Sequence, residues 1–144
     1  MVIDDLKLTG ALKISLNDEI VHQCDNLVVT AGKNWVAGRF KDGSIPAEMS
    51  HMAIGSADTA PAAGNTALAT ELNRIALTTD GGTVSTNTVQ YDASWTSAAA
   101  AYAIKEAGIF NASTGGTMLA RTTFAVINKG TDDTVSISWT ITVS

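Results

Sequence analysis

The chain has 144 residues, the length of one domain, and its 9 Lys and Arg against 14 Asp and Glu give a formal net charge of −5. Apolar residues make up 45% and charged residues 16% of the chain, a balance that excludes an intrinsically disordered protein and a long charged coiled coil. No window concentrates Lys and Arg, so we expect no nucleic-acid partner. The longest apolar run, residues 98–104, is far shorter than the roughly 20 residues that span a bilayer, and no signal-peptide pattern opens the sequence, so we expect no membrane partner.

The first 26 residues predict a β-hairpin. Apolar residues alternate with polar ones from Leu6 to Leu16, the period of a half-buried strand. Residues 17–19 read as a turn, and the chain returns through residues 20–24. This hairpin either packs on its own domain or, as the alternative, reaches a partner as an N-terminal arm of residues 1–26.

A short helix is predicted near residues 31–41, where the period of the apolar residues changes. Trp35–Val36 and Arg39–Phe40 are spaced to share one side of a helix. Thr30 is the residue type expected at an N-cap, and the Gly and Pro of residues 42–46 end the helix.

The remaining chain reads as short strands separated by turns. One or two helical turns are expected at residues 66–72, capped by Asn65 or Thr66. The four alanines at residues 98–101 favour helix by propensity but are too few to decide the assignment. These patterns predict a mainly β fold, an antiparallel β-sandwich or open barrel of jelly-roll or immunoglobulin-like type, with the one short helix covering an end. We expect one domain over residues 1–144, with strands at residues 51–55, 75–79, 88–95, 103–110, 118–127 and 134–144 and a small-residue loop at 56–65.

The nucleophilic and metal-binding side chains do not form a recognisable site. His22 and Cys24 share one face of a predicted strand, but residues two apart are too distant for a good hydrogen bond and nothing nearby orients the imidazole. Cys24 is the single cysteine, so no internal disulfide forms. Zinc needs three or four ligands, and the two histidines and the cysteine are not clustered in the sequence. We therefore predict no enzyme activity, no metal and no cofactor.

Glu106 is the exceptional carboxylate because it lies between apolar stretches. A catalytic role requires a second carboxylate in the same cleft, and no partner for it can be identified from the sequence. We therefore predict a buried structural pair with an arginine, either Arg74 or Arg121. The tryptophans occupy patterned apolar positions and are expected in the core. The predicted interface or structural residues are Trp35, Arg74, Glu106, Phe110, Arg121 and Trp139.

Several segments resemble small structural proteins of tailed bacteriophages. The main one is residues 50–74, an apolar strand ending in Gly, a Thr/Ala/Pro loop and then a Leu…Glu-Leu…Arg turn. Residues 27–35, 105–111 and 136–142 match the same proteins, so the resemblance covers roughly residues 27–144. The order of motifs is also similar to the attachment domain of long tail fibres, without a shaft or a receptor-binding tip.

The resemblance implies a non-enzymatic virion protein, a tail, baseplate or fibre-attachment component assembled in the host bacterial cytoplasm. Its partners would be other copies of itself, in a homo-oligomer, and other phage structural proteins. The alternative in the same class is a capsid decoration protein on the phage head. A second alternative is a carbohydrate- or receptor-binding module, which requires exposed aromatic side chains.

Overall fold

The computed structural model describes residues 6–41 and 43–144. Residues 1–5 of the predicted hairpin segment and Asp42, in the segment predicted to end the helix, lie outside the described residues. The described chain is mainly β, with 51% of residues in strands, as predicted. Its elements are β1 (Leu8–Leu16), β2 (Glu19–Val28), α1 (Thr30–Arg39), β3 (His51–Gly55), β4 (Glu71–Ala76), β5 (Thr83–Ser85), β6 (Thr88–Trp95), β7 (Tyr102–Phe110), β8 (Met118–Lys129) and β9 (Val135–Val143).

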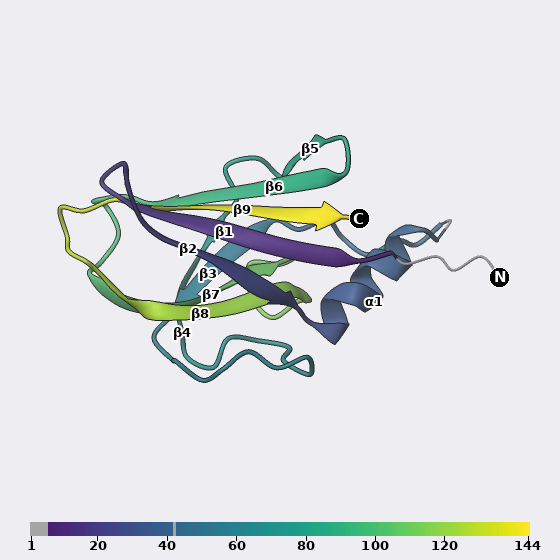
Figure 1. The fold of residues 1–144 in the computed structure, drawn as a ribbon, viewed down its shortest axis with the longest axis horizontal. Helices are drawn as coiled ribbons and strands as arrows, with labels where there is room; N and C mark the ends of the chain where they lie inside the picture. The colour runs from purple at the N-terminus through teal and green to yellow at the C-terminus, as the bar shows by residue number, and fades with distance from the viewer. Residues whose placement is uncertain (1–5, 42) are drawn as a thin grey trace.

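The strands form one curled antiparallel sheet in the order β4-β3-β7-β8-β2-β1-β9-β6-β5 (Figure 1). The curl brings β3 and β4 back against β6. There, Trp95 Nε1 donates to Asn73 Oδ1 over 2.9 Å, and Thr78 N donates to Asp92 O over 2.8 Å. The result is a half-barrel, within the predicted sandwich or open-barrel class.

The β1–β2 hairpin is an integral part of this sheet. β1 lies between β2 and β9 and pairs with β9 from Leu8 to Leu16. The two turn residues, Asn17 and Asp18, have φ angles of 51° and 67°, the left-handed conformation that Asn and Asp tolerate and that a tight hairpin turn requires. Figure 1 places this turn and the β8–β9 turn at one end of the molecule and α1 at the other.

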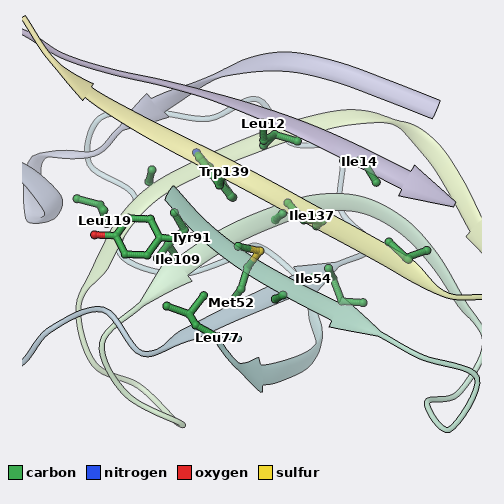
Figure 2. Close-up of a cluster of buried hydrophobic side chains, with 14 of the residues drawn as sticks. Leu12, Ile14, Met52, Ile54, Leu77, Tyr91, Ile109, Leu119, Ile137 and Trp139 are labelled. Carbon is green, nitrogen blue, oxygen red and sulfur yellow. The ribbon is translucent and has the colours of Figure 1, made fainter. Parts of the chain in front are cut away.

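The main core lies between the two halves of the curled sheet (Figure 2). Strands β1, β6 and β9 point every second side chain inward, which buries most of their apolar residues and leaves mainly polar residues outside, Ser and Thr above all. Facing them are apolar residues of β3, β7 and β8. The side chains that meet include Leu12, Ile14, Tyr91, Ile137 and Trp139 on one side and Met52, Ile54, Ile109 and Leu119 on the other.

Strands β3, β7 and β8 are buried on both faces. Four or five consecutive residues are buried in each strand, because the loop at residues 56–70 and the start of α1 (Ala31) cover the face that points away from the main core. A second, smaller core lies on that face, formed by Val29, Ala53, Leu68, Phe110 and Met118.

The predicted helix is confirmed, but its predicted N-cap is wrong. Val29 occupies the N-cap position, no side chain caps the helix, and Thr30 is the first helical residue. Thr30 N instead donates to Ala63 O in the covering loop, over 2.8 Å. With 10 residues, α1 is too short to cross a bilayer, and the described part of the chain contains no longer helix.

The helical turns predicted at residues 66–72 are also wrong. Residues 66–70 are irregular and β4 begins at Glu71, which pairs with Gly55 of β3. Asn65 does not cap a helix; its Oδ1 accepts from Ala62 N over 2.8 Å and from a distant arginine. The backbone of this segment is held by groups far away in the sequence, and these groups define the candidate site.

Candidate functional site

Glu106 and Arg121 form a buried ion pair. Their side chains are 0% and 1% exposed, and the carboxylate Oε2 accepts from Arg121 Nη2 over 2.8 Å and from Nε over 3.1 Å. Glu106 is opposite Thr123 in the β7–β8 ladder, so Arg121, two residues along β8, is its diagonal neighbour on the same face. The predicted buried pair is therefore made with Arg121 and not with Arg74.

The ion pair holds both ends of the covering loop. At its C-terminal end, Thr70 N donates to Glu106 Oε1 over 2.7 Å and Ala69 N donates to Oε2 over 3.1 Å. Toward its start and in its middle, Arg121 donates through Nη2 to Thr59 O over 2.9 Å and through Nη1 to Asn65 Oδ1 over 3.1 Å. We call this arrangement the loop clamp: Glu106, Arg121 and the groups of Thr59, Asn65, Ala69 and Thr70 that they bind.

The loop clamp depends on a glycine at the end of β3. A Cβ at Gly55 would overlap the Glu106 carboxylate and the Thr70 carbonyl. Glycine lets the carboxylate lie directly against the backbone. Of the clamp residues in the loop, Thr59 was not singled out from sequence and Asn65 was named only as a helix cap. Gly55, which ends an apolar strand, was the visible signal for a close approach here.

Two other predicted residues, Arg74 and Phe110, form a separate contact. Arg74 Cζ lies 3.7 Å from the centroid of the Phe110 ring, a cation–π geometry. The same guanidinium forms an ion pair with Glu71 Oε1 at 2.7 Å and donates to the carbonyls of Ala112 and Gly115 over 2.9 Å each. Arg74 therefore ties β4 to the β7–β8 turn.

The structure places the predicted tryptophans apart from both clusters. Trp139 is fully buried, and its Nε1 donates to Asn26 Oδ1 over 2.6 Å. Trp35 is half-buried in α1, with its Nε1 bonded to Ala47 O over 2.7 Å. Both rings pack on the main core, so their role is structural.

His22 and Cys24 each bind a residue of β8. The His22 ring packs on Phe124 with 5.6 Å between centroids, and Cys24 Sγ lies 3.7 Å from Thr122 Oγ1. Burial raises the pKa of the Cys24 thiol above 9.0, which keeps it protonated and weakly nucleophilic at neutral pH.

A second candidate pair, Ser50 and His51, was missed from sequence. Ser50 Oγ lies 2.8 Å from His51 Nδ1. The residues are adjacent in the chain, and none of the carboxylates that the structure describes is hydrogen-bonded to the other ring nitrogen. The pair therefore lacks the group that would orient the imidazole as a base.

No group of three or more His, Cys, Asp or Glu that could hold a metal ion occurs within residues 6–41 and 43–144. No family model, no curated protein and no solved structure matches the chain. The loop clamp is thus interpreted from its own geometry: its buried charges bind one another and the loop backbone, and they fix a surface segment in place.

Proposed function

We propose that the chain is a non-enzymatic structural protein of a tailed bacteriophage virion, a tail, baseplate or fibre-attachment component that assembles by protein–protein contacts. The observation that carries the proposal is the loop clamp. The segments that resemble phage structural proteins, residues 50–74 and 105–111, contain the bound loop and Glu106, which are parts of this clamp, and Gly55, against which the carboxylate lies; Arg121 falls outside them. The segments that resemble phage structural proteins therefore overlap with the loop clamp.

The clamp leaves no reactive group for catalysis. Glu106 is the one carboxylate that the sequence singled out for a possible catalytic role, but it is 0% exposed and both of its oxygens accept hydrogen bonds. A general acid or base must reach the proton that it transfers. Glu106 is covered by the loop that it binds, so the geometry favours a structural role.

The clamped loop also suits a docking element. Its residues 58–60 and 62–64 are exposed, small or polar side chains on a backbone that is anchored at residues 59, 65, 69 and 70. A partner that binds an ordered loop does not have to order it. Such a loop fits close packing against a neighbouring protein in an assembly.

The carbohydrate-binding alternative requires exposed aromatic rings that stack on a sugar, and two of the three tryptophans cannot provide one. Trp95 and Trp139 are 1% and 0% exposed, and a buried ring cannot stack on a sugar. The capsid-decoration alternative depends on the same loop clamp and differs only in its position on the particle.

Immunogold labelling tests the proposal. Antibodies raised against the recombinant protein are applied to phage particles released from the host strain that carries the gene, with pre-immune serum as the control. We expect gold at the tail tip, the baseplate or the collar. Gold over the head would replace the proposal with the capsid-decoration alternative, and particles without gold would overturn the virion assignment.

A further inference from the structure

We draw no further inference here: the strongest candidate, the apolar groove between the start of β1 and α1 that is lined by Leu6, Val36, Phe40 and Val143, leaves the side chains of Leu6 and Phe40 exposed, but nothing in the structure shows what covers it.

Discussion

The half of the sheet formed by β1, β6 and β9 and the half formed by β3, β7 and β8 are stabilised by different chemistry. In the first half, burial alternates residue by residue, with apolar side chains inside and mainly polar side chains outside, Ser and Thr above all. In the second half, both faces are buried, and the outer face carries an ion pair under a loop. The comparison shows that a strand with one buried face (a one-sided strand) is stabilised mainly by the apolar side chains that it buries. A strand with two buried faces also needs a hydrogen-bond or ionic partner for every polar group that it buries.

Among the substitutions that distinguish the two halves, Arg121→Met is expected to lower the free energy of unfolding most. This change leaves the Glu106 carboxylate buried without its counter-ion and removes the bonds to Thr59 and Asn65. Removing one partner of a buried pair costs about 3–5 kcal/mol. We expect that loss in the free energy of unfolding measured by urea denaturation, together with new proteolytic cleavage within residues 56–70.

Lys105→Met is the matched control for this prediction. Lys105 is adjacent to Glu106, but its ion pair with Asp58 is exposed and has an Nζ–Oδ2 distance of 3.6 Å. Exposed pairs contribute about 0–1 kcal/mol. If Arg121→Met and Lys105→Met lower the free energy of unfolding by the same amount, the buried ion pair is not what stabilises this half of the sheet.

Lys129→Met extends the comparison to the far end of β8. Lys129 is 2% exposed, and its Nζ donates to the carbonyls of Ala99, Ala100 and Gly130 over 3.0–3.3 Å. Leaving buried acceptors without a donor costs about 1–3 kcal/mol. Urea denaturation should show a loss in this range, and a more stable variant would indicate that apolar volume matters more than these bonds.

Ile14→Val probes the one-sided half. Ile14 is 1% exposed in the main core, and removing one buried methylene of this kind costs about 0.5–1.5 kcal/mol. The loop at 56–70 should keep its resistance to protease, because the clamp is untouched. Cleavage in the loop of this variant would show that the two halves are not stabilised separately.

The smallest effect concerns the turn that joins β8 to β9. The Asn17 side chain, 2.8 Å from Asp133 Oδ1, and the Gly130 amide hold the pKa of Asp133 below its usual 3.8. A carboxyl with a lowered pKa contributes stability that is complete above its unfolded pKa and is lost as the pH falls through its folded pKa. Asp133→Asn should therefore lower the melting temperature slightly at neutral pH and not at all in strong acid. A difference between the two proteins that is independent of pH would contradict this assignment.

The one-sided strands could be predicted from sequence because each residue's environment repeats every second position. The predicted strands at residues 88–95 and 134–144 correspond to β6 and β9 within a residue or so. The short helix was predicted for the same kind of reason, a local period. The buried pairing of Glu106 was also predictable, since a carboxylate between apolar stretches needs a cation.

The loop clamp itself could not be predicted. Residues 66–72 have helical character locally, but the amides of Ala69 and Thr70 bind a carboxylate that lies 36 or 37 residues further along the chain. The sequence left Arg74 and Arg121 as equal partners for Glu106, and the β7–β8 register selects Arg121. Sequence period carries no information about such distant contacts.

Hydrogen exchange at Ala69 and Thr70 tests the central claim most directly, namely that the buried ion pair fixes the loop. The account predicts that both amides are protected in the parent chain. In Glu106→Gln the single acceptor oxygen stays with Arg121 and Ala69, so Thr70 loses its acceptor and its protection, while the amides of β1 and β9 stay protected. Amides of Ala69 and Thr70 that exchange at the rate of an open loop in the parent chain would contradict it.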